Sequence, residues 1–141
     1  MFDKILLPTD GSEFSEHTVE RAIKALSDDG EIIILSVASK LEANTLFHSK
    51  KNIARMNEGF FKEAEDNVNR RAKRFDDRVN VRKMVVTGIP SDTIIEIADK
   101  EDVDLIIISA SGKSGLHKFF IGSVAEKVLK SSEKDVLLVH N

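Results

Sequence analysis

The chain alternates between short aliphatic runs and longer stretches in which apolar residues return every three or four positions. The short runs predict strands at residues 4–7, 32–37, 79–87, 104–108 and 136–139. The runs at 32–37 and 104–108 are apolar almost without a break. Such continuity is typical of strands that are buried on both faces of a parallel sheet.

The periodic stretches between these runs predict four helices. The first is expected to end at residues 28–30, Asp-Asp-Gly, and the third to follow the turn at 88–91. Residues 38–52 carry no period and are expected to form a loop that leads into the long second helix. The residues expected to face the core are, helix by helix, Val19, Ala22, Ile23 and Leu26; Ile53, Met56, Phe60, Ala64, Val68, Ala72 and Phe75; Ile94, Ile95 and Ala98; and Val124, Ala125, Val128 and Leu129.

Strands that alternate with helices predict right-handed crossovers, and so an α/β fold with an open five-stranded parallel sheet and helices on both faces. The length of 141 residues fits one domain spanning residues 1–141. In such sheets ligands bind outside the carboxyl ends of the strands, where the strand order reverses. This rule points to the loops after Leu7, Leu35 and Ile108.

The loop after the fourth predicted strand has the composition of a phosphate-binding loop. Gly112, Gly115 and Gly122 lie in this loop or at the start of the next helix, and serines and lysines stand among them. Glycine lets backbone N–H groups approach an anion, and a helix N-terminus adds further donors. Neither G-x-x-x-x-G-K-[ST] nor G-x-G-x-x-G is present. A glycine-containing surface turn therefore stays open as the simpler interpretation.

Asp10 follows the first predicted strand and would lie across the sheet from that loop. Its carboxylate could accept hydrogen bonds from ribose hydroxyls or a purine amino group, or it could cap the first helix. The four histidines are scattered without ligand spacing, and no G-x-S-x-G elbow is present. We therefore expect neither a metal site nor catalytic residues.

Composition narrows the possible classes of protein. The chain has no cysteine, which excludes disulfides, thiolate zinc sites, iron–sulfur clusters and a cysteine nucleophile. A net charge of −3 argues against nucleic acid or an anionic membrane as partner. The apolar run at the N-terminus is too short for a signal peptide, and the run at 105–108 is too short for a membrane span. We expect a soluble, cytoplasmic protein.

Three segments carry recognisable motifs. Residues 5–12 read Ile-Leu-Leu-Pro-Thr-Asp-Gly-Ser, and residues 88–106 contain the pattern G-I-P…I…A…D-L-I. Gly112 is followed by nine residues and then by Gly122-Ser123. Together these motifs resemble the universal stress protein family over essentially the whole chain, and the last is similar to the second half of its nucleotide motif, G-x-x-G-x9-G-[ST]. Ser109 stands where the first glycine of that motif belongs.

The resemblance implies a Rossmann-like, adenine nucleotide alpha hydrolase-like fold that binds ATP, or ADP or AMP, with Mg²⁺ as a companion ion. It implies contacts to the adenosine part from the first two strands and contacts to ribose and phosphates from the glycine loop. The implied adenosine contacts are Pro8, Thr9, Asp10 and Val37. The implied ribose and phosphate contacts are Ser109, Gly112, Lys113, Ser114, Gly115, Gly122, Ser123, Val124 and Ala125.

The sequence is compatible with three functions. The leading hypothesis is a regulatory stress-response protein that binds adenine nucleotide and acts as a homodimer. The alternatives are a slow ATP hydrolase and an interaction module with an empty nucleotide cleft. Hydrolysis needs a nucleophile, charge stabilisation and usually a metal carboxylate, for which only Asp10 is available. Ser109 favours an empty cleft, because its Cβ disfavours positive φ. We therefore expect Ser109→Gly to bind nucleotide more tightly, or at least no more weakly, than the parent.

The predicted strand at 136–139 ends the chain and is apolar on both faces, so it is expected at an edge of the sheet. Exposed apolar edge strands associate unless they are paired or covered. The same strand of a second copy, antiparallel across a two-fold axis, would cover it. The family resemblance implies the same homodimer. The alternative is that the long helix or residues 38–52 fold over this edge.

Overall fold

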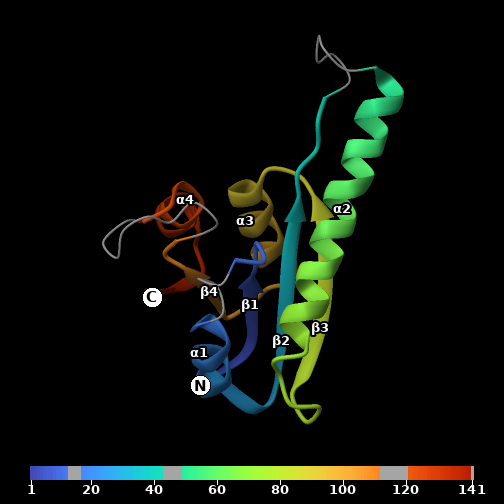
Figure 1. Ribbon diagram of the computed structural model, residues 1–141. Helices are drawn as coiled ribbons and strands as arrows, with labels where there is room; N and C mark the ends of the chain where they lie inside the picture. The colour runs from blue at the N-terminus through green and yellow to red at the C-terminus, as the bar shows by residue number, and fades with distance from the viewer. Residues whose placement is uncertain (13–16, 43–48, 112–120, 141) are drawn as a thin grey trace.

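The computed structural model describes residues 1–12, 17–42, 49–111 and 121–140. Over these residues strands and helices alternate as the sequence predicts (Figure 1). The elements are β1 (Phe2–Pro8), α1 (His17–Ala25), β2 (Leu26–Ala38), α2 (Lys50–Ala72), β3 (Asn80–Thr87), α3 (Pro90–Lys100), β4 (Leu105–Ser109), α4 (Ser123–Ser131) and β5 (Asp135–Val139).

The five strands form one parallel sheet in the order β3-β2-β1-β4-β5. The order reverses at β1, since β2 and β3 lie on one side of it and β4 and β5 on the other. β1 pairs with β2 as far as Pro8, whereas its pairing with β4 ends at Leu6 and Ile106. The carboxyl ends of β1 and β4 therefore separate, which opens a crevice at the switch point.

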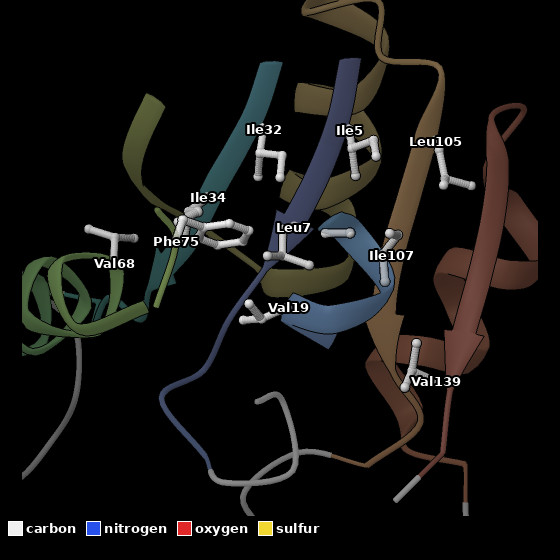
Figure 2. Close-up of a cluster of buried hydrophobic side chains, with 11 residues drawn as sticks. Ile5, Leu7, Val19, Ile32, Ile34, Val68, Phe75, Leu105, Ile107 and Val139 are labelled. Carbon is white, nitrogen blue, oxygen red and sulfur yellow. The ribbon is translucent and has the colours of Figure 1, made fainter. Parts of the chain in front are cut away.

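Two apolar clusters cover the two faces of the sheet. α1 and α2 lie on one face, over a cluster that includes Ile5, Leu7 and Ile107 (Figure 2). α3 and α4 lie on the other, over a cluster that includes Leu6 and Ile106. Successive side chains of a strand point to opposite faces, so each central strand contributes to both clusters. This explains why the runs in β2 and β4 are apolar without alternation, and it confirms the predicted fold class.

The first helix is shorter than predicted. α1 ends at Ala25, and Leu26 together with residues 28–30 belongs to β2. Leu26 pairs with Phe2 of β1 before a shift in register. Because this pairing satisfies the backbone across the start of the sheet, it ends the helix before the Asp-Asp-Gly sequence. Ile23, expected in the core, is 47% exposed.

The long second helix begins at Lys50, where the side chain of Ser49 accepts a hydrogen bond from the amide of Asn52. It lies along β2 and β3 (Figure 1). The helix ends at Ala72, so Phe75 joins the core from beyond its end. The predicted loop at 38–52 is thus shorter at both ends, and its residues 43–48 lie outside the described part of the chain.

Two other core predictions are wrong and one edge prediction is confirmed. Met56 of α2 and Leu129 of α4 are exposed, although the spacing of apolar residues places them on the buried stripes. The period of apolar residues marks one face of a helix, but by itself it does not fix the burial of each side chain on that face. β5 is an edge strand, as predicted. Among the described residues, no helix combines the length and apolar character needed to span a membrane.

Candidate functional site

A cavity of about 270 Å³ lies at the carboxyl edge of the sheet, where β1 and β4 separate. Strand ends form its floor, and the starts of α3 and α4 form part of its wall. Its volume is close to the lower limit for small-molecule pockets. The lining residues are Pro8, Thr9, Asp10, Leu35, Val37, Pro90, Ile94, Ile108, Ser109, Ala110, Ser111, Gly122, Ser123, Val124 and Ala125.

The structure brings together all the predicted site residues that it describes. Pro8, Thr9, Asp10, Val37, Ser109, Gly122, Ser123, Val124 and Ala125 all line this cavity. Gly112, Lys113, Ser114 and Gly115 lie outside the described residues. The nucleotide-binding role of these residues stays a prediction.

The wall combines apolar side chains with short polar ones. Leu35, Ile94 and Ile108 are buried members of one core cluster and reach the cavity from β2, α3 and β4. Thr9 and Ser111 are buried polar residues on the same wall. An apolar surface suits a flat heterocycle, and hydroxyl groups suit the hydroxyls and phosphates of a polar ligand.

The residues after β1 form a tight turn, here called turn 9–12. The amide of Thr9 donates to the carbonyl of Leu35 over 2.8 Å, which extends the β1–β2 ladder by one residue. The amide of Ser12 donates to Asp10 Oδ1 over 2.9 Å, and Gly11 between them has a φ of 80°. Asp10 therefore closes an Asx turn.

Two residues of α2 contact turn 9–12, and neither is among the site residues predicted from the sequence. Arg71 Nη2 donates to Thr9 Oγ1 and to the carbonyl of Ser12, each over 3.3 Å. Asn67 lies against Gly11, because a Cβ at Gly11 would overlap the Asn67 amide. The available signal was spacing: Asn67 and Arg71 follow Ala64 at three and seven residues, on the buried face of the helix.

Hydrogen bonds hold the described chain just after β4, both within the segment and to its neighbours. Ser109 Oγ donates to the carbonyl of Ser111 over 2.7 Å. The amide of Ala110 donates to the carbonyl of Val139 in β5 over 2.8 Å. The carbonyl of Ala110 accepts a hydrogen bond from the amide of Gly122 over 2.7 Å. Gly122 is the N-cap of α4, and its amide is already used. The amides that α4 can offer to a ligand are therefore those of its first turn, which begins at Ser123.

Asp10 is the one ionisable residue among the described residues that line the cavity. The N-terminus of α4 contributes partial positive charge on the same wall. Asp92 of α3 pairs with Lys127 of α4 and so links the two helices that flank the cavity. Across the part of the chain that the structure describes, no group of three or more His, Cys, Asp or Glu residues could hold a metal ion.

Comparison with known proteins decides the family. Residues 1–140 match the sequence profile of the universal stress protein family. The chain belongs to the universal stress protein family. Universal stress protein MJ0577 of Methanocaldococcus jannaschii is 34% identical, with 99% of this chain and 95% of that protein aligned. Universal stress protein YxiE of Bacillus subtilis is 30% identical over 99% of both chains.

Solved structures of universal stress proteins share the fold. The structure of MJ0577 superimposes with a TM-score of 0.83 over 99% of this chain and 96% of that one. A universal stress protein in complex with cAMP gives a TM-score of 0.61 at 26% identity, over 99% of this chain and 97% of that one. Universal stress proteins thus include at least one relative whose ligand is an adenine nucleotide.

Proposed function

We propose that this universal stress protein is a cytoplasmic regulator that binds an adenine nucleotide, ATP in the first place, in the cavity between β1 and β4. The observation that carries the proposal is the position of that cavity. It lies at the switch point of the sheet and is lined by every described residue that the family resemblance assigns to the nucleotide. The related protein in complex with cAMP supports the same class of ligand.

The chemistry of the wall suggests how the nucleotide lies. The aliphatic side chains of Val37, Ile94 and Ile108 offer an apolar surface for the adenine ring. The Asp10 carboxylate, on the neighbouring turn, is an acceptor for ribose hydroxyls. The first turn of α4 and the Ser123 hydroxyl supply donors for phosphate oxygens.

The remaining phosphate contacts would come from the backbone of residues 112–115 and from the Lys113 ammonium group. Mg²⁺ would accompany the phosphates of ATP and reduce their charge. ADP and AMP are alternatives that need fewer of these contacts.

The described part of the cavity does not favour hydrolysis. A phosphoryl-transfer site needs a placed nucleophile, groups that stabilise charge and usually carboxylates that hold a metal. Asp10 is the one carboxylate on the described wall, and we place it beside the ribose. We therefore propose binding and regulation as the function, with a slow ATP hydrolase and an empty-cleft interaction module as the alternatives to be tested.

We further propose that the protein is a homodimer through β5. β5 is an edge strand, and Leu137 on it is exposed. The two segments that could cover β5 instead are the long helix and the loop before it, and their described residues lie elsewhere. α2 packs on β2 and β3, and Leu41 is hydrogen-bonded to Asn57 of α2. An antiparallel second copy of β5 would pair the edge and bury its apolar residues.

Mass analysis of nucleotide released from the purified native protein on denaturation tests the proposed ligand. We expect ATP, ADP or AMP in the released fraction and saturable binding of ATP by calorimetry. The absence of both would support the empty-cleft alternative and overturn the proposal. A single-turnover assay with Mg²⁺ and radiolabelled ATP then separates a binding protein from a hydrolase, since only the hydrolase releases phosphate.

A further inference from the structure

A buried cation lies against turn 9–12, which forms part of the cavity wall. Arg71 is 4% exposed and belongs to α2, on the opposite face of the sheet from α3 and α4. It is not itself on the wall of the cavity. Its Nη2 donates both to Thr9 Oγ1 and to the carbonyl of Ser12, so one guanidinium nitrogen joins the first and last residues of the turn.

A second α2 residue supports the middle of the turn. Asn67 is buried one helical turn before Arg71 and occupies the space beside Gly11. Its side chain is held in place by Arg70, whose Nη2 donates to Asn67 Oδ1 over 2.6 Å. Asn67 and Arg71 therefore contact the turn at Thr9, Gly11 and Ser12.

The turn also has internal hydrogen bonds that depend on the same atoms. The amide of Gly11 donates to Thr9 Oγ1 over 3.2 Å, and this oxygen is also the acceptor for Arg71. Asp10 Oδ1 accepts from the amide of Ser12, whose carbonyl accepts from Arg71. The Arg71 guanidinium is thus bonded to Thr9 and to Ser12, the residues on either side of the segment that carries the Asp10 carboxylate.

Burial of a guanidinium is costly unless its hydrogen bonds are satisfied, and an apolar side chain of similar volume would often serve stability equally well. The contacts of Arg71 are directed instead at polar atoms of a turn that lines a ligand cavity. Arginine suits this task because its planar group presents several donors in a fixed geometry, which the single ammonium of lysine does not.

We infer that Arg71 is a positioning residue for the nucleotide site: it holds turn 9–12 in the conformation that presents Asp10 to the ligand. The inference rests on the proposed function for the identity of the ligand. Arg71 acts through Thr9 and Ser12. Its loss should therefore weaken nucleotide binding and should also loosen the turn in the unliganded protein.

The test measures two quantities at 25 °C on the full chain: the dissociation constant of ATP, by calorimetry, and the exchange rates of the Gly11 and Ser12 amides without nucleotide, by NMR. For Arg71→Met we expect about tenfold weaker binding, or about 1.4 kcal/mol, and exchange at both amides at least threefold faster. Arg71→Lys should recover part of each effect. Arg55→Met, which removes an exposed arginine from the same helix, is the matched control and should change neither quantity.

A double-mutant cycle with Thr9→Val separates positioning from general destabilisation. If Arg71 acts through Thr9, the losses of ATP affinity in Arg71→Met and Thr9→Val will be clearly less than additive in the double variant. A general loss of stability would lower the melting temperature of Arg71→Met and leave its affinity unchanged while it is folded. If Arg71→Met does not fold, Arg71→Lys is judged by the same two measurements.

Unchanged exchange at Gly11 and Ser12 in a folded Arg71 variant would overturn the positioning role, whatever happens to affinity. Faster exchange with an unchanged dissociation constant would also overturn it. Failure of the parent protein to bind ATP would instead overturn the proposed function, and the exchange measurement would still show whether Arg71 holds the turn.

Discussion

The hydroxyl of Ser109 donates a hydrogen bond to the backbone carbonyl of Ser111, with 2.7 Å between the two oxygen atoms. A glycine at this position, as in the nucleotide motif of the family, could not form this bond. Asp102 is the one described non-glycine residue with a positive φ, so the backbone at Ser109 does not require glycine. Ser109 therefore holds the start of the loop after β4 through the hydrogen bond of its side chain, whereas a glycine would only make the backbone there more flexible.

This bond changes the expectation for Ser109→Gly. The sequence alone predicts that glycine binds nucleotide no more weakly, whereas the structure shows that a loop contact would be lost. A hydrogen bond makes a net contribution of about 0.5–1.5 kcal/mol to the stability of a folded conformation. Since the bound loop would lose this contribution, we expect ATP to bind roughly three- to tenfold more weakly to Ser109→Gly and to Ser109→Ala. Calorimetric titration of both variants decides the matter. Tighter binding by the glycine variant alone would show that backbone freedom at this position outweighs the bond.

Gly122→Val tests the phosphate end of the proposed site. Gly122 has a φ of −64°, which any residue adopts, and among the described residues a Cβ there would meet the Ala110 carbonyl alone, at an ordinary contact distance of 3.5 Å. We therefore expect the variant to fold with a melting temperature close to that of the parent. Its isopropyl group would stand beside the first turn of α4, and ATP binding should fall by at least tenfold. Gly122→Ala adds one methyl group, and its affinity for ATP should lie between those of the parent and of Gly122→Val. Parental affinity in the valine variant would refute the site assignment.

Gly11→Ala should destabilise the protein, and Gly59→Ala should stabilise it. Alanine at Gly11 would need a φ of 80° and would overlap the amide of Asn67, so we expect a loss of about 1–3 kcal/mol in the free energy of unfolding. Gly59 is exposed within α2, and a Cβ there meets no atom of the described residues within 4 Å, so alanine should add about 0.5–1 kcal/mol to the free energy of unfolding. Urea denaturation of the two variants measures both changes. Equal effects would mean that turn 9–12 relaxes around the new methyl group.

Leu137→Lys is the sharpest test of the proposed dimer. Leu137 on β5 and Leu129 on α4 are both 38% exposed, so Leu129→Lys is a matched control for the introduction of a charge. Val139 is unsuitable for this purpose because it is 4% exposed and belongs to the core. We expect sedimentation analysis at micromolar concentration to show a dimer for the parent and the control, and a folded monomer for Leu137→Lys. A parent that is already monomeric would exclude the dimer.

The ion pairs of Arg82 give the fold a pH-dependent contribution. Arg82 Nη2 lies 2.7 Å from Glu101 Oε2 and 3.1 Å from Glu31 Oε1, which links β3 to the end of α3 and to β2. The hydrogen bond from Arg82 lowers the pKa of Glu101 below its ordinary value. A lowered folded-state pKa stabilises the fold above the pKa of the unfolded chain, and this contribution is lost as the pH falls through the folded-state pKa.

We therefore expect Glu101→Gln to melt at a lower temperature than the parent at pH 7 and at nearly the same temperature at pH 2–3. Glu96→Gln, which changes an exposed glutamate of the same helix, is the matched control. Melting curves recorded by circular dichroism across this range supply the comparison. A difference between Glu101→Gln and the parent that does not depend on pH would mean that the glutamine disturbs packing and that the charge is unimportant.

The apolar runs were sufficient to predict the strands and the sheet that they form. Ile33 and its neighbours in β2 can all be buried only if both faces of the strand are covered, which requires a parallel sheet between two layers of helices. The carboxyl ends of such strands then meet at one edge, so the turn at Asp10 and the loop at Ser109 could be assigned to the same site. Both are local features of the sequence joined by a general rule of topology.

The contacts that shape the site depend on the tertiary structure. Arg71 and Thr9 are 62 residues apart, and no local pattern shows that a charged residue on the buried face of α2 meets a turn after β1. Likewise, α1 ends at Ala25 because Leu26 pairs with Phe2 of β1, although the helical spacing of apolar residues continues to Leu26. Local spacing fixes which face of an element is apolar, but a side chain's partner depends on how distant elements pack, because hydrogen bonds and burial are satisfied across the whole fold and not within one segment.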